Sequence, residues 1–186
     1  NDPGMSAEAL ARRIAPVAKL QLEGTAEVAP AAQAPKVATV AAAPAAGGKP
    51  DGKNVYDTAC MEVGGRAVCN WDNKSHDWVT ASDGLAQSLN VVAAQISTGM
   101  GSERFYTYVR RFGFGSLTGI DLDSEGPGMV KLPGDSNWFP SDLGTNSFGQ
   151  GIAVTPIQML TAVASVANEG MLMQPYIVKE FIKFID

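Results

Sequence analysis

The stretch "GQGIAVTPIQMLTAVASVANEG", residues 149–170, contains the strongest helix signal in the chain. Thr155 is a favourable N-cap, Pro156 suits the first helical position, and Gln158 completes a capping box with Thr155. Gly170 stops the pattern. Apolar residues recur at helical spacing at Ile157, Leu160, Ala164 and Ala167. These signals predict a helix over residues 155–168 with one apolar face.

Weaker signals predict further elements between residues 54 and 186. Ser102 and Gly113 bound a helical pattern whose apolar positions are Phe105, Tyr108, Val109 and Phe112. Residues 79–97 should form two helical pieces that join near Ser88, the first capped by Thr80. The tail alternates as a strand does, at Tyr176, Val178, Glu180, Ile182 and Phe184. Together these patterns predict an α+β domain over residues 54–186.

The residues before this domain differ in composition. Residues 25–53 are rich in Ala and Pro and contain no aromatic residue, and four prolines interrupt any long helix. We predict a disordered linker there. Residues 1–24 offer Ser6 as an N-cap and a short helical spacing that Pro16 interrupts, which predicts a short, marginal helix.

The overall charge narrows the choice of partners. The net charge is -5 and the pI is about 4.9, with no run of basic residues, so we do not expect a nucleic-acid partner. No stretch of about 18 apolar residues occurs, so we expect no membrane-spanning segment. The first residues lack the pattern of a signal peptide, as a fragment of a longer chain also would.

The two cysteines, Cys60 and Cys69, flank two short runs that meet at Gly64-Gly65, a favourable hairpin turn. With this turn, Cys60 faces Cys69 in a non-hydrogen-bonded pair, where Cα atoms lie about 4.5 Å apart. That separation is at the short end of disulfide geometry. A disulfide would indicate an oxidising envelope compartment. The alternative is two reduced cysteines that match by chance.

Candidate sites of other kinds are weak. The one histidine, His76, lies in a polar loop without a nucleophile turn nearby, which favours a solvated loop residue. Asp121, Asp123 and Glu125 alternate as in a calcium loop, but the rest of that motif is missing. One histidine and two distant cysteines do not make a metal site. We expect neither a metal nor a cofactor.

The triplet Ser88-Leu89-Asn90 is weak alone and becomes informative through its neighbours. The segments "GGRAVCNWDNKSHDWVTASDGLAQSLNVVAAQI", "FYTYVRRFGFGSLTGIDL" and "SFGQGIAVTPIQMLTAVASVANEGMLMQPYIV" resemble consecutive parts of the class B penicillin-binding protein transpeptidase domain. The resemblance covers residues 55–186. It implies a serine β-lactamase-like α+β fold, with helices against an antiparallel sheet that is incomplete here.

The resemblance also implies a function. The family's site combines Ser-x-x-Lys, Ser-x-Asn and Lys-Ser/Thr-Gly. By this resemblance Ser88 would relay protons to the leaving group, and Asn90 would hydrogen-bond the substrate amide. Phe148 and Gln150 would lie near the site, without assigned roles. The implied activity is peptidoglycan cross-linking in the bacterial cell envelope, with D-Ala-D-Ala stem peptides as substrates and β-lactams as ligands.

Two of these three clusters are missing from the sequence. No serine is followed by lysine three residues later. The nearest approach to the third cluster, Lys74-Ser75-His76, has histidine in place of glycine. We therefore expect a partial domain that does not form the acyl-enzyme. Its helices should expose apolar faces through which chains could associate.

The N-terminal 60 residues have a resemblance of their own, to the leader of a c5-type cytochrome c, up to "DGKNVYDTACM". That family continues into Cys-x-x-Cys-His, whereas Met61, Glu62 and Val63 follow Cys60, so a haem-binding electron carrier is disfavoured. The break suggests a chimera of two gene pieces that join near residue 61. A second alternative to the partial transpeptidase is a non-catalytic cell-envelope interaction module.

Overall fold

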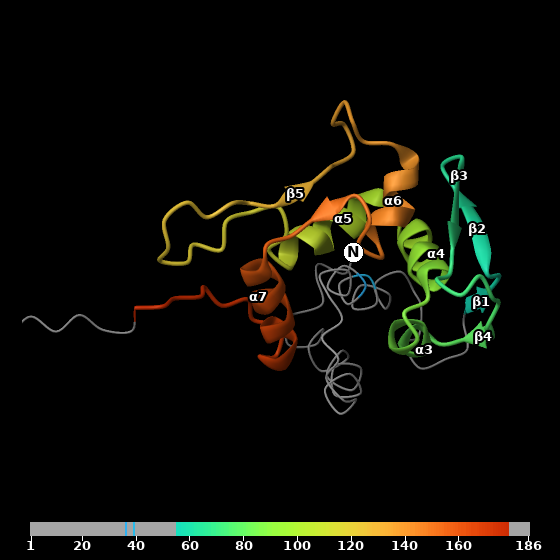
Figure 1. Ribbon diagram of the computed structural model, residues 1–186, viewed down its shortest axis with the longest axis horizontal. Helices are drawn as coiled ribbons and strands as arrows, with labels where there is room; N and C mark the ends of the chain where they lie inside the picture. Colours follow the sequence, from blue (N-terminus) through green and yellow to red (C-terminus); the bar gives the residue numbers. More distant parts are fainter. Residues whose placement is uncertain (1–35, 37–38, 40–54, 179–186) are drawn as a thin grey trace, which may run out of the picture.

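The computed structural model describes Lys36, Thr39 and residues 55–178 (Figure 1). From residue 55 on, four strands are followed by three helices, and only the last four elements alternate between strand and helix, in an α+β arrangement. In chain order the elements are β1 (Val55–Asp57), β2 (Cys60–Val63), β3 (Arg66–Cys69), β4 (Asp77–Val79), α3 (Ala81–Ala86), α4 (Asn90–Met100), α5 (Ser102–Arg111), β5 (Met129–Val130), α6 (Pro140–Asn146), β6 (Ile152–Ala153) and α7 (Pro156–Ala167).

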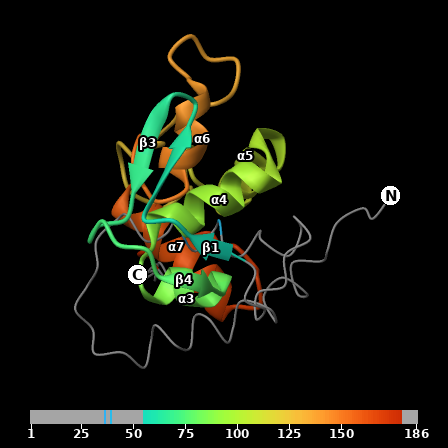
Figure 2. The same ribbon diagram turned by 90° about the vertical axis from the view of Figure 1, so that its right-hand side faces the viewer.

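The strands form three separate antiparallel pairs, β1–β4, β2–β3 and β5–β6. Within the described residues these pairs do not join into a larger sheet. The predicted combination of helices with an incomplete antiparallel sheet is therefore confirmed. Figure 2 shows the β2–β3 hairpin in front of α4, with β1 and β4 beside it.

The β2–β3 hairpin has the predicted register, in which Cys60 faces Cys69 and Val63 faces Arg66. Gly64 and Gly65 form the turn with φ angles of 56° and 77°, which glycine adopts without strain. The two cysteines are joined by a disulfide. The end of β3 is thereby fixed to the start of β2.

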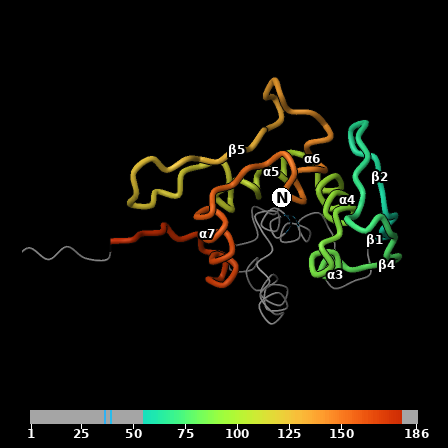
Figure 3. The backbone as a smooth tube through the Cα atoms, viewed as in Figure 1, coloured from blue at the N-terminus to red at the C-terminus, as the bar shows by residue number. Residues whose placement is uncertain are grey.

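Helix α4 is the central element of the described part of the chain. It contacts α3, α5, α6 and the strands β1, β2 and β3. Its Val91 and Ala94 are fully buried, and Val92 is 1% exposed. A second apolar cluster lies between α5 and α7, around Phe105, Val109, Phe114, Ala162 and Val166. Figure 3 shows α4 between α5 and the β2–β3 hairpin.

Helix α7 begins at the predicted N-cap, Thr155, and has the predicted capping box with Gln158. The predicted apolar face does not pack inward in the described structure: Leu160 is 63% exposed, and Ala164 and Ala167 are exposed. The opposite face is buried, with Gln158 and Ser165 among its residues. Gln158 Nε2 donates to Ser116 O and Pro127 O, so this polar side chain is buried with its hydrogen bonds made.

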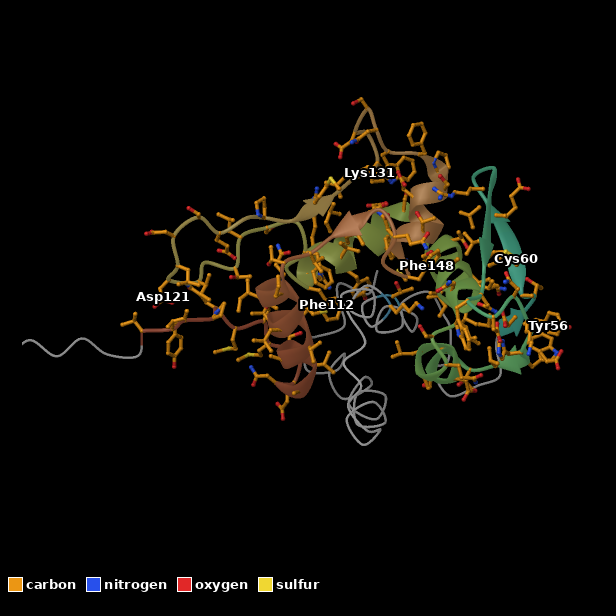
Figure 4. The ribbon with its side chains drawn as sticks, in the orientation of Figure 1. Tyr56, Cys60, Phe112, Asp121, Lys131 and Phe148 are labelled. Carbon is orange, nitrogen blue, oxygen red and sulfur yellow. A yellow bond between two sulfur atoms is a disulfide. The ribbon has the colours of Figure 1, made fainter. Side chains whose placement is uncertain are left out.

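The tail differs from its prediction. Residues 171–178 form no strand, and residues 179–186 lie outside the described part. A strand requires a neighbouring strand to accept its backbone N–H groups. Here the Asp121 carboxylate accepts from Ile177 N at 2.6 Å and Val178 N at 2.7 Å instead. Figure 4 shows Asp121 in the loop beside this segment.

Most of the N-terminal predictions fall outside the described residues, including the helix over residues 1–24. Within the stretch predicted as a linker, residues 25–53, only Lys36 and Thr39 are described. Both have helical backbone and are buried, at 5% and 0% exposure. No helix in the described part of the chain is long and apolar enough to cross a membrane.

Candidate functional site

Ser88 lies at a sharp break between two helices. Helix α3 has the predicted Thr80 cap, and α4 begins at Asn90, so the predicted pair of helical pieces near Ser88 is confirmed. The φ angle of Ser88 is 57°, in the left-handed region that residues with a Cβ rarely adopt. Strained backbone of this kind clusters at functional sites.

Lys36 contacts Ser88 from a distant part of the sequence. Its Nζ donates to Ser88 Oγ at 2.6 Å and to the Ser88 carbonyl oxygen at 2.9 Å. Because the ammonium group is buried away from water, the pKa of Lys36 is lowered from 10.5 to about 8. An amine with this pKa can gain or lose a proton near neutral pH, which suits acid–base work beside a hydroxyl.

Asn90 is held on the hairpin side of the break. Its Nδ2 donates to the carbonyl oxygen of Cys69 at 3.0 Å. Asn90 is the first residue of α4 and is partly buried. Ser88 and Asn90 therefore keep fixed positions relative to each other, one bound to Lys36 and the other to the end of β3.

The segment after α6 borders the same region. Thr39 Oγ1 donates to the carbonyl oxygen of Ser147 at 3.2 Å. Phe148 is 6% exposed and packs with Val63, Val68, Ala93 and Ala94, between the hairpin and α4. Gln150 is exposed. The two described residues of the N-terminal part thus contact both the Ser-x-Asn turn and the residue before Phe148.

Lys36 is the site residue that the sequence did not predict. A search that starts from each serine misses it, because Gln33 stands three residues before it. The usable signal is the lysine itself, within an Ala/Val-rich run ahead of the hairpin. The Ala/Pro composition concealed this signal, since it favours a linker over a helix that carries a site residue.

His76 lies in a loop, as predicted, but its side chain is partly buried and paired with two carboxylates, not fully solvated. Its side chain is 23% exposed, with Nδ1 2.8 Å from Asp57 Oδ2 and Nε2 3.3 Å from Asp72 Oδ2. The reason is Asp57, a fully buried carboxylate that requires donors around it.

In the loop that contains Asp121, Asp123 and Glu125, a carboxylate accepts hydrogen bonds from residues of the same loop. Glu125 accepts from Thr118 Oγ1 at 2.6 Å and from Gly119 N at 2.9 Å. These hydrogen bonds, that of the Thr118 side chain first, lower the pKa of Glu125. Within the described residues, no group of three or more His, Cys, Asp or Glu side chains could hold a metal ion.

Two substitutions distinguish the effect of the left-handed backbone at Ser88 from the effect of its hydroxyl group. Ser88→Gly and Ser88→Ala both remove the hydroxyl acceptor of Lys36 and keep the carbonyl acceptor, but only alanine keeps the strain. We expect Ser88→Ala to be less stable than Ser88→Gly by about 1 kcal/mol in urea unfolding. The Lys36 titration midpoint, followed by NMR at Cε, should shift equally in both variants. Equal stability of the two variants would contradict the strained conformation.

The sequence and the fold of this chain are similar to those of one known protein family. The family model of the penicillin-binding protein transpeptidase domain matches residues 7–185. This match runs across residue 61, where the resemblance to a cytochrome leader ended. Among curated proteins, stage V sporulation protein D of Bacillus subtilis is 38% identical over 127 residues, which cover 68% of this chain and 19% of that protein. Penicillin-binding protein PbpB of Mycobacterium tuberculosis is 32% identical, over 64% of this chain and 17% of its own.

The similar solved structures are also penicillin-binding proteins. The apo form of penicillin-binding protein 3 from Mycobacterium tuberculosis matches with a TM-score of 0.70 and 28% identity, covering 81% of this chain and 33% of that one. Its complex with ampicillin matches with a TM-score of 0.71 and 26% identity, over 86% and 37%. The chain spans about a fifth of the length of the curated relatives named above. In family and in fold, this chain belongs to the penicillin-binding protein transpeptidase domains.

Proposed function

We propose that this chain supplies the lysine and the Ser-x-Asn turn of a peptidoglycan transpeptidase site, and that it binds D-Ala-terminated stem peptides and β-lactams without forming an acyl-enzyme. The observation that carries this proposal is the 2.6 Å contact between Lys36 Nζ and Ser88 Oγ. It joins a lysine with a lowered pKa to the serine of the family's second cluster.

The two groups suit proton transfer to a leaving amine. Protonated Lys36 donates to Ser88 Oγ, whose own hydrogen is then directed away from the lysine. Where the family's attacking serine is present, a serine in this position could pass that proton to the leaving group and regain one from the lysine; in this chain, which lacks that serine, no group leaves. Asn90 would orient the substrate, as the family resemblance implies. These residues bind and move protons, and none of them attacks a carbonyl.

The nucleophile is the part that this sequence replaces. In the Ser-x-x-Lys pattern the attacking serine stands three residues before the lysine, and this chain has Gln33 at that distance from Lys36. An amide side chain has no hydroxyl to deprotonate, so no acyl-enzyme can form through it. Gln33 is an internal position of the sequence.

Binding without acylation can be tested with ampicillin and the full chain. We expect saturable NMR shifts of the Asn90 side-chain amide and of Lys36 Cε at millimolar ampicillin, with no added mass on the protein. Asn90→Ala should remove the response at Lys36 Cε, and Asn168→Ala, at the C-cap of α7, should leave it unchanged. A covalent ampicillin adduct on this chain would refute the non-acylating role, and an unresponsive wild type would refute binding.

A gain-of-function variant tests the role of Lys36 directly. Gln33→Ser restores a serine three residues before Lys36, and we expect labelling by a fluorescent penicillin at least tenfold above the unaltered chain. The double variant Gln33→Ser/Lys36→Met should lose the label, because the serine then has no base. Equal labelling of the single and double variants would exclude Lys36 as that base.

A cell-envelope interaction module is the second candidate, and one observation favours it. Helix α7 exposes Leu160 and Val163, at 63% and 47%, and residues 171–178 expose further apolar side chains. Contiguous exposed apolar surface marks interaction sites. An envelope location fits both candidates, because the Cys60–Cys69 disulfide persists in oxidising compartments.

A further inference from the structure

Helix α4 begins without a cap of its own. Its N-cap residue is Leu89, whose side chain makes no capping hydrogen bond. The first N–H groups of a helix need acceptors from elsewhere when the N-cap cannot supply one. For α4 the acceptor comes from outside the helix: Asn70 Oδ1 accepts from Val91 N at 3.1 Å. Asn70 therefore caps the helix that carries Asn90 from a distance of 21 residues in sequence.

Asn70 is buried, and hydrogen bonds of its backbone and its side chain hold it in place. It is 2% exposed, and its backbone N donates to Ala59 O at 2.8 Å. Its Nδ2 donates to the two Asp57 carboxylate oxygens at 2.9 and 2.7 Å, and to Lys74 O at 3.1 Å. These acceptors fix the Nδ2 end of the amide toward Asp57, so that the Oδ1 end faces Val91 N.

Asp57 completes the support and depends on His76. The Asp57 carboxylate is fully buried, at the end of β1. It also accepts from His76 N at 3.0 Å, and His76 Nδ1 lies 2.8 Å from it. A buried carboxylate is stable only when such donors surround it. His76 reaches the surface, where its Nε2 lies 3.3 Å from Asp72 Oδ2.

The last residue of β3 and the residue after it thus hold two consecutive residues at the start of α4. Cys69 O accepts from the Asn90 side chain and Asn70 Oδ1 from the Val91 backbone. We propose that Asp57, Asn70 and His76 form a positioning unit that sets the orientation of the Ser88–Asn90 turn toward Lys36. These three residues make no contact with substrate in this proposal. Their role in a site rests on the proposed function, whereas the positioning itself does not.

The test uses NMR on the full chain and substitutes the surface end of the unit. We expect His76→Ala to raise the exchange rate of the Val91 N–H at least tenfold and to leave that of Val109 in α5 unchanged. The Lys36 Cε midpoint should move up from about 8 toward 10.5, because burial is what lowers this pKa and the displaced turn would no longer shield the ammonium group from water. His76→Asn, whose amide can donate in place of Nδ1, should restore both values.

The controls separate positioning from general stability. Asp72→Asn changes only the outer partner of His76, keeps an oxygen that can accept from Lys74 N, and should change neither readout. If His76→Ala does not fold, the isosteric Asp57→Asn gives the same comparison. Faster exchange at Val91 and Val109 alike, or an unchanged Lys36 midpoint, would overturn the proposal. Neither readout involves ampicillin, so a chain that fails to bind ampicillin leaves this result intact.

Discussion

Replacing Lys36 by methionine should remove a rise in stability that the unaltered chain shows above pH 8. Burial lowers the pKa of Lys36 to about 8, whereas the unfolded chain has the ordinary value of 10.5. Between these values the unfolded state binds more protons, so the free energy of unfolding increases with pH. The burial penalty is fully present below pH 8 and is relieved by pH 10.5. The difference amounts to about 3 kcal/mol over this range.

Urea unfolding at pH 7, 8 and 9.5 measures this effect. Lys74→Met is the matched control, because Lys74 is exposed. It should keep the slope that Lys36→Met loses. The series stops at pH 9.5 because burial raises the pKa of Tyr106, and stability from that group is lost only as the pH rises above 10. The same slope in both variants would show that Lys36 is solvated.

The second large effect is expected at the tip of the hairpin. Gly64 has a φ of 56°, and a Cβ there would meet the backbone of α6, at 2.6 Å from the Pro140 carbonyl carbon and closer still to Ser141 N. Gly64→Ala therefore combines left-handed strain with overlap against backbone that cannot rotate away. We expect a loss of about 3 kcal/mol in the free energy of unfolding.

Gly65→Ala is the comparison for this change. Gly65 has a φ of 77°, and nothing lies within 4 Å of the position its Cβ would take. Its alanine variant should lose only the strain, about 1 kcal/mol. Chemical denaturation of the two variants decides between contact and strain. Equal losses would mean that the hairpin tip does not pack against α6.

Local signals carried the successful predictions. Thr80 and Thr155 cap their helices because each capping box lies within four residues and needs no distant partner. The hairpin register followed from a two-residue turn, which determines every pair after it. The Ser-x-Asn turn was placed correctly between two helical pieces for the same reason.

The failures concern contacts between distant residues. The exposed apolar face of α7 agrees with the expectation, but its buried face contains Gln158, which donates to Ser116 O and Pro127 O, and helical periodicity does not predict such distant partners. The contact between Lys36 and Ser88 joins residues 52 positions apart. Composition argued for a linker at Lys36, and a single lysine in an Ala/Pro-rich run has no spacing that would reveal its partner.

The distant capping of α4 has a practical consequence for engineering. A graft of residues 80–100 onto another scaffold would carry Ser88 and Asn90 but would leave behind both acceptors that orient the start of the helix, Cys69 O and Asn70 Oδ1. Such a peptide would contain the Ser-x-Asn sequence but would not hold the start of the helix in its present orientation. The smallest transferable unit therefore begins at Val55, because β1 supplies Asp57.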